Sequence, residues 1–169
     1  MSAVDSFGSK STLTVGGTDY EVFRISSSQA KLSGDCQDDP DHTSNLRDGA
    51  TFILYATSGD TDDIYYLDTG GDSVLTGELG DDGSYSFSGK VTDIQDTGDD
   101  AKITTITTVT ISLVVDGNEC SGTQTAALAS SCAGAGCDFF TPSACSLTST
   151  FTGVLLEDTD VSADSDAST

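Results

Sequence analysis

The residues of this chain best suited to holding a ligand are aspartates, which gather in short acidic turns. The chain has 28 acidic and 6 basic residues. Ca²⁺ takes six to eight oxygen ligands, and carboxylates and turn carbonyls can supply them. No acidic run matches the twelve-residue calcium loop with its closing glutamate, and aspartate is also a standard turn residue, so solvated hairpin turns are the preferred interpretation. The calcium candidates are Asp60, Asp62, Asp63, Asp81, Asp82, Asp99 and Asp100.

Cysteines form the second group of chemically capable residues. Four of the five fall within 26 residues around a glycine-rich segment. This clustering predicts two disulfides, and disulfides indicate an oxidising compartment. Four cysteines allow three pairings, and their spacing does not choose among them. The remaining cysteine, Cys36, is predicted to be a free thiol or to pair with the C-terminal group. The disulfide candidates are Cys120, Cys132, Cys137 and Cys145.

The single histidine, His42, gives the only support for a transition-metal site. Thiolate, imidazole and carboxylate are all ligands of such metals. Zinc sites, however, are built from spaced pairs of cysteine or histidine, and neither this segment nor the C-terminal cysteine group offers two such pairs. A polar loop is therefore the preferred interpretation. The other candidate ligands around His42 are Cys36, Asp38, Asp39 and Asp41.

Hydrolytic chemistry has little support in the residue pattern. A Ser-His-Asp or Cys-His site would need His42, which lies outside every predicted strand. No carboxylate pair stands out for glycosidase chemistry, and no phosphate-binding glycine motif precedes a helix. We therefore predict a protein that is not an enzyme and has no cofactor, with Ca²⁺ left open. A metal- or carboxylate-dependent hydrolase is the third functional alternative.

The elements that must position these residues are predicted to be strands. Ile103 to Val115 alternates β-branched residues with threonine and serine, and Asp116-Gly117-Asn118 can reverse the chain into a second strand. Similar runs recur along the chain with a Gly/Asp turn between them. The pattern predicts an all-β antiparallel domain, either an up-and-down barrel (a lipocalin-like meander) or a β-sandwich of jelly-roll or Ig-like type. The predicted strands are 11–15, 20–25, 51–57, 63–68, 74–79, 84–92, 102–115, 119–128 and 146–157.

The predicted core follows from the side-chain alternation within these strands, because alternate residues share one face of a sheet. One face of each run carries most of its large apolar residues. The core candidates are Phe52, Leu54, Tyr85, Phe87, Val91, Phe151, Leu155 and the odd-numbered residues from 103 to 115.

The predicted organisation is a single domain with loose ends. Residues 1–9 are expected to form a flexible leader, 10–157 the all-β domain and 158–169 a disordered acidic tail. Residues 26–49 have low hydrophobicity and are expected to be a loop or crossover. Residues 130–145, which contain the Gly-rich cysteine segment, are expected to form a disulfide-stapled C-terminal loop.

The formal charge of −22 limits the classes of partner. It repels phosphate backbones and anionic lipid, so nucleic-acid binding is excluded, and no apolar run is long enough for a membrane helix. Solubility, Ca²⁺ binding and a salty habitat are competing causes of the acidity. Residues 1–5 do not resemble a signal peptide. An extracytoplasmic location therefore requires a mature form, and an intracellular protein with reduced thiols is the alternative.

The predicted function is a non-catalytic binding or interaction module, secreted, periplasmic or on the cell surface. Its partner would be a protein, or a small apolar ligand inside the barrel. The alternative is a structural subunit of a surface assembly or filament, in which the long Thr-rich strand pairs at an exposed edge. The sequence leaves the oligomeric state open.

Overall fold

The computed structural model describes residues 13–15, 18–36, 45–56, 64–70, 74–98 and 100–156. The predicted leader, the predicted tail, His42 and the calcium candidates Asp60, Asp62, Asp63 and Asp99 lie outside these residues. The strands are β1 (Leu13–Val15), β2 (Thr18–Gly34), β3 (Thr51–Tyr55), β4 (Ile64–Asp68), β5 (Val74–Leu79), β6 (Ser84–Asp96), β7 (Lys102–Asp116), β8 (Glu119–Ala133) and β9 (Ala144–Leu155), with a 3-10 turn, η2 (Ala135–Cys137), between the last two.

The strands form a closed antiparallel barrel of the meander type. Each strand pairs with its neighbour in sequence, and β2 also pairs with β9, which closes the sheet from β2 to β9. Short connections favour pairing between sequence neighbours. The prediction of an all-β, antiparallel, up-and-down fold is confirmed. Of the two predicted architectures, barrel and sandwich, the structure is a barrel.

A β-bulge in β2 lets one strand serve two parts of the sheet. Residues 20–24 pair with β3 and residues 23–34 pair with β9, so that Phe23 and Arg24 have both strands as neighbours. The register with β9 shifts between Ile25 and Ser27, and an extra residue of this kind bends a strand. The main chain of Ile25 also bonds to residues 49 and 50, with N···O distances of 2.9 and 2.8 Å. The strand can therefore turn away from β3 and continue along β9.

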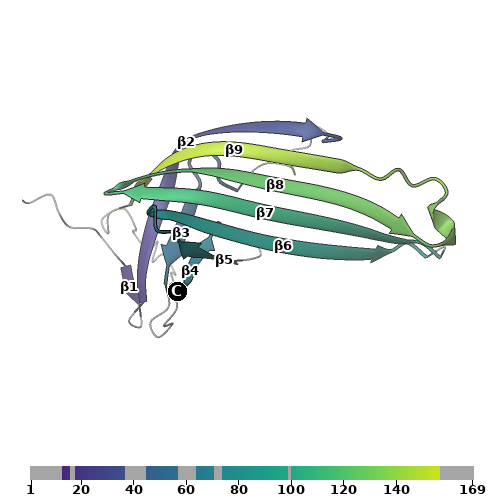
Figure 1. Cartoon of the computed structure of the whole chain (residues 1–169), viewed down its shortest axis with the longest axis horizontal. Coiled ribbons are helices and arrows are strands. Elements are labelled where there is room, and N and C mark those ends of the chain that lie inside the picture. Colours follow the sequence, from purple (N-terminus) through teal and green to yellow (C-terminus); the bar gives the residue numbers. More distant parts are fainter. Residues whose placement is uncertain are drawn as a thin grey trace, which may run out of the picture.

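Five strands extend beyond the barrel as a single layer (Figure 1). At about 3.4 Å per residue, the 15-residue strands β7 and β8 are close to three times as long as the five-residue strands β3 and β4. We call the part beyond the barrel the projecting sheet. It comprises residues 32–34 of β2, 89–96 of β6, 102–109 of β7, 126–133 of β8 and 144–147 of β9, which lie alongside one another in register.

The barrel interior is filled by aromatic and aliphatic side chains. Phe23 and Phe52 stack with their ring centroids 5.1 Å apart, and the Phe151 ring meets Phe52 edge-on at 6.2 Å. A barrel of eight strands is just wide enough for side chains to fill. The buried core comprises Phe23, Ile25, Leu46, Phe52, Leu54, Leu67, Leu75, Phe87, Ile111, Leu113, Cys120, Phe151 and Leu155.

Most of the predicted core is confirmed, but Ile103, Thr105 and Thr107 lie in the projecting sheet outside the core, and Val91 is a clear error. Phe52, Leu54, Phe87 and Phe151 are buried as expected. Val91 is wrong, because 56% of its surface is exposed. It lies on the same face of β6 as Phe87 but four residues further on, where the strand has left the barrel.

The predicted loop at 26–49 is also partly wrong, because residues 26–34 continue β2. This stretch reads Ser-Ser-Ser-Gln-Ala-Lys-Leu-Ser-Gly and has few apolar residues because the sheet there leaves most of them in contact with water. A strand that is exposed to solvent on both faces lacks the alternation of apolar and polar residues by which a half-buried strand is recognised in a sequence.

Candidate interaction surface

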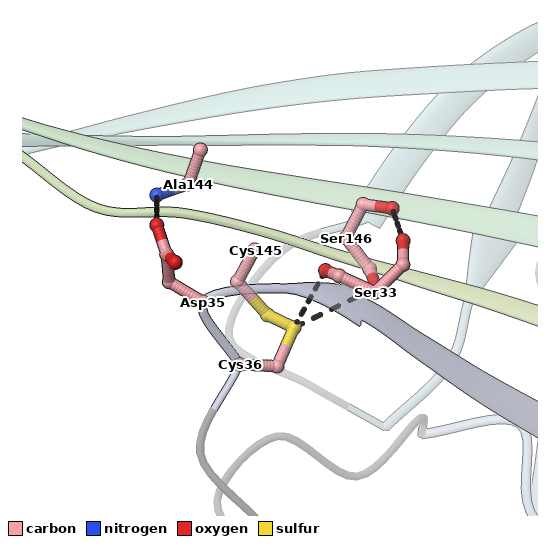
Figure 2. Close-up of a disulfide and its surroundings, with 6 residues drawn as sticks. All are labelled: Ser33, Asp35, Cys36, Ala144, Cys145 and Ser146. Carbon is pink, nitrogen blue, oxygen red and sulfur yellow. Dashed lines mark hydrogen bonds between the residues drawn. A yellow bond between two sulfur atoms is a disulfide. The ribbon is translucent and has the colours of Figure 1, made fainter.

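A disulfide between Cys36 and Cys145 fastens the end of β2 to the start of β9 (Figure 2). The Cα atoms of the two cysteines are 4.8 Å apart. Beside the bond, the Asp35 N–H donates to the Ala144 carbonyl at 2.8 Å, and the Ala144 N–H donates to the Asp35 carboxylate at 3.3 Å. The outermost strand of the projecting sheet is thereby held at its tip.

The prediction that Cys36 is a free thiol is wrong. The alternative prediction, that Cys36 pairs with one of the C-terminal cysteines, is confirmed. Cys36 and Cys145 are 109 residues apart in sequence. They can pair because Gly34, two residues before Cys36, is the register partner of Cys145 on the adjacent strand. Cys132 and Cys137 form the second disulfide. The free cysteine is Cys120, which had been grouped with the disulfide candidates.

The Cys120 thiol lies in the barrel core and is expected to be unreactive. Only 4% of its surface is exposed, and burial raises the pKa of the thiol to about 11, partly offset by a backbone hydrogen bond from Gly153. At pH 8 the thiolate, which is the reactive form, is then about a thousandth of the total. We expect iodoacetamide to add nothing to the native protein at pH 8, one group in denaturant and five after reduction, as measured by intact mass.

Two features of the same labelling experiment would contradict this account. Labelling of the native protein at a rate close to that of the unfolded chain would show that Cys120 is accessible. Two or more adducts in denaturant without reductant would show that a disulfide is missing.

The raised pKa of Cys120 also makes the stability of the protein depend on pH. Protons bind more tightly to this thiol in the folded state, so its contribution to stability falls as pH rises from about 9 to 11.

A face rich in serine and threonine, with exposed Ile94, Val114 and Val154 among them, covers the outside of β6–β9 and the second half of β2. Along each strand, the residues that alternate with the buried core point to this side, and most are exposed. The register aligns them in rows across the strands, such as Ser88, Thr110, Thr125, Thr148 and Lys31. We call this surface the hydroxyl face. Its hydroxyl residues are Ser84, Ser86, Ser88, Thr92, Thr104, Thr108, Thr110, Ser112, Ser121, Thr123, Thr125, Ser131, Ser146, Thr148, Thr150, Thr152, Ser27 and Ser33.

The hydroxyl face differs from the rest of the chain in charge. Acidic residues occupy its register positions only at strand ends, namely Asp96, Asp116 and Glu119, whereas Lys31 and Lys90 lie within it. Acidic residues outnumber basic residues 28 to 6 in the whole chain. A random placement would therefore put more acidic than basic side chains within this face. On this broad surface, acidic side chains are therefore confined to the ends of the strands.

The described acidic candidates act in turns. The Asp82 carboxylate accepts hydrogen bonds from the Ser84 hydroxyl at 2.7 Å and the Ser84 N–H at 3.0 Å, and these bonds lower the pKa of Asp82. Asp100 lies in the turn between β6 and β7 with φ of 56°. Within the described ranges, no three His, Cys, Asp or Glu side chains converge as metal ligands would. Calcium binding remains a prediction for the chain as a whole.

The far end of the projecting sheet carries an exposed aromatic residue. Phe139 is 99% exposed in the segment that follows η2. The Cys132–Cys137 disulfide constrains this segment, and its base is closed by a bond from the Ser130 N–H to the Ser143 carbonyl at 2.9 Å. The stapled C-terminal loop predicted from the sequence is confirmed, although β8 runs further into it than expected, to Ala133.

Sequence reasoning missed the hydroxyl face, although a signal was available. Threonine or serine recurs at alternate positions in residues 104–112, apart from Ile106, and in residues 121–125 and 146–152. Within a single strand, such threonines indicate only the more exposed side of that strand. A surface emerges only when the register places the three runs side by side.

The fold and surface define an acidic, disulfide-linked, antiparallel β-barrel with a projecting sheet. No protein-family model matches the chain, and no curated protein or solved structure shows significant similarity to it. Among the described residues, no helix is long and apolar enough to cross a membrane. The two disulfides indicate an oxidising, extracytoplasmic environment.

Proposed function

We propose that the protein is a non-catalytic binding module, secreted, periplasmic or on the cell surface, and that it contacts a protein partner through the hydroxyl face. The observation that carries the proposal is the confinement of carboxylates to the strand ends of that face, at Asp96, Asp116 and Glu119, in a chain of charge −22. Like charges brought together at an interface are costly, so a partner can approach most easily where this protein is neutral. Hydroxyl groups in register also offer both donors and acceptors.

The packed interior supports a surface-binding role over a ligand held inside the barrel. Phe23, Phe52 and Phe87 are almost fully buried in the positions that a lipocalin-like ligand would need. The filament alternative, as predicted, required the long Thr-rich strand at an edge. This expectation is wrong, because β7 pairs with β6 and β8 along its whole length.

A site-specific photo-crosslink tests the proposal. Thr125 lies in the middle of the hydroxyl face, and Thr51 is an equally exposed threonine on β3, outside that face. We expect a photo-reactive residue at Thr125 to give a discrete adduct with the envelope fraction of the source cells, and one at Thr51 to give none. Unlabelled protein should compete the adduct away, whereas a Thr123→Glu/Thr148→Glu variant should compete at least tenfold less well.

Three outcomes would contradict the proposal: equal adducts from both positions, equal competition by the double variant, or no adduct at Thr125. The double variant must first show the unfolding midpoint of the unmodified protein. Both substituted threonines are exposed, and surface substitutions of this kind change stability by about 0.5 kcal/mol or less.

A further inference from the structure

The far half of β6 has one open edge. β6 pairs with β5 only through Tyr85–Ser88, but it pairs with β7 as far as Asp96. In the part of the chain that the structure describes, no strand lies on the other side of residues 89–96. Figure 1 shows β6 as the border of the projecting sheet. In an antiparallel pair, alternate residues direct their N–H and C=O groups away from the partner strand, so this edge presents unpaired backbone groups.

Two large apolar side chains flank these unpaired groups. Val91 is 56% exposed and Ile94 is 62% exposed, and they stand on opposite faces of the strand. Natural proteins usually protect open edges with charge, proline or a covering loop, because a bare edge is a template for another strand. An added strand would satisfy the backbone groups and cover part of both side chains.

The other border of the sheet, β2, lacks such exposed apolar side chains and is covalently fastened. β2 is tied to β9 by the Cys36–Cys145 disulfide. None of the large hydrophobic residues that are exposed among the described residues lies on it. The edge of β6 is therefore the more favourable place for strand addition.

The charge of the edge disfavours a second copy of this chain. Among the antiparallel registers of two β6 edges, the one that pairs Lys90 with Asp96 also places Asp93 opposite the same aspartate of the other copy. Like charges directly opposite each other destabilise a strand pair. Each copy also carries a charge of −22. A lysine or arginine opposite Asp93 would be attractive instead, and the field of the whole protein draws cationic segments toward it.

We propose that residues 89–96 of β6 accept an added β-strand from a cationic, extended segment of a partner protein. Backbone hydrogen bonds supply the affinity, as in other β-augmentation complexes, and side-chain matching supplies the selectivity. Apolar or β-branched residues of the partner cover Val91 and Ile94, and a cation meets Asp93. The inference gives a chemistry to the partner of the proposed binding function, but the edge can be tested separately from the hydroxyl face.

The test uses two synthetic peptides and backbone amide exchange. One probe is a blocked eight-residue peptide of valine and threonine with lysine at every third position, so that each face carries both apolar residues and a cation, and the second has glutamate in place of each lysine. We expect the lysine probe to slow exchange at the outward-facing amides of residues 89–96, and the glutamate probe to leave them unchanged. Raising the salt concentration from 50 to about 500 mM should weaken binding, since it screens the exposed charges.

Matched charge variants separate a specific site from general attraction. Asp93→Lys and Asp116→Lys change the net charge equally, and both aspartates are exposed, but Asp116 lies at the turn between β7 and β8. We expect Asp93→Lys to weaken the lysine probe about tenfold and to let the glutamate probe bind, a change of the size seen for charge pairs at interfaces. Asp116→Lys should change the dissociation constant less than twofold.

Several outcomes would overturn the inference: no slowed amides in residues 89–96, equal binding of the two probes, or equal effects of the two variants. Protection of these amides in the protein alone, rising with its concentration, would assign the edge to a second copy instead. Peptide binding without the Thr125 crosslink would support strand addition at β6 and contradict the proposal that the hydroxyl face binds a partner. A Thr125 crosslink without peptide binding would do the reverse.

Discussion

Replacing Cys36 and Cys145 by serine is expected to lower the free energy of unfolding by about 4 to 5 kcal/mol. The disulfide joins residues 109 apart in sequence, and the stabilisation by a crosslink grows with the length of chain it closes in the unfolded state. Natural domains have only about 5 to 15 kcal/mol of stability, so the loss would be a large fraction of the total. Urea unfolding of the oxidised protein and of the double variant measures it.

The second disulfide provides the matched control for this prediction. Cys132 and Cys137 are only five residues apart, and the same relation gives about 2 kcal/mol for so short a loop. We therefore expect Cys132→Ser/Cys137→Ser to be the milder variant by about a factor of two. Equal losses for the two pairs would mean that native contacts around the bonds, rather than loop closure, set their contribution.

Local sequence pattern accounted for most of the barrel. Alternation with turn residues located all nine strands, although it ended β2 nine residues and β8 five residues too early, and it identified Phe52, Phe87 and Phe151 as core. These predictions succeeded because a strand with one dry face carries its own periodic signal. The same reasoning failed at Val91, where the sheet has left the barrel, and at residues 26–34, which carry few apolar side chains and are mostly exposed.

The candidate surfaces required information that no single strand contains. The Cys36–Cys145 pairing depends on β2 lying beside β9, a contact between distant parts of the chain. The hydroxyl face depends on the register of five strands, and the open edge depends on β5 ending at Leu79 while β6 continues to Asp96. The Thr-rich strand β7 was expected at an edge because its sequence does not reveal that β8 follows it along its full length.

Replacing Phe87 by alanine is expected to lower the free energy of unfolding by about 3 to 5 kcal/mol, the usual range for a phenylalanine removed from a core. Phe87 is 2% exposed, and its ring lies over Gly77, its register partner on β5. The neighbouring chain cannot easily fill the space, because a glycine has no side chain with which to do so. Thermal or urea unfolding of the variant measures the loss.

Val91→Ala is the matched control, since Val91 stands on the same face of the same strand. Its exposed position predicts a change of about 0.5 kcal/mol or less. The contrast between the two substitutions marks where along β6 the barrel ends and the projecting sheet begins. A loss at Val91 comparable to that at Phe87 would mean that this face of the projecting sheet is packed against something, and the open edge proposed for strand addition would then be covered in the free protein.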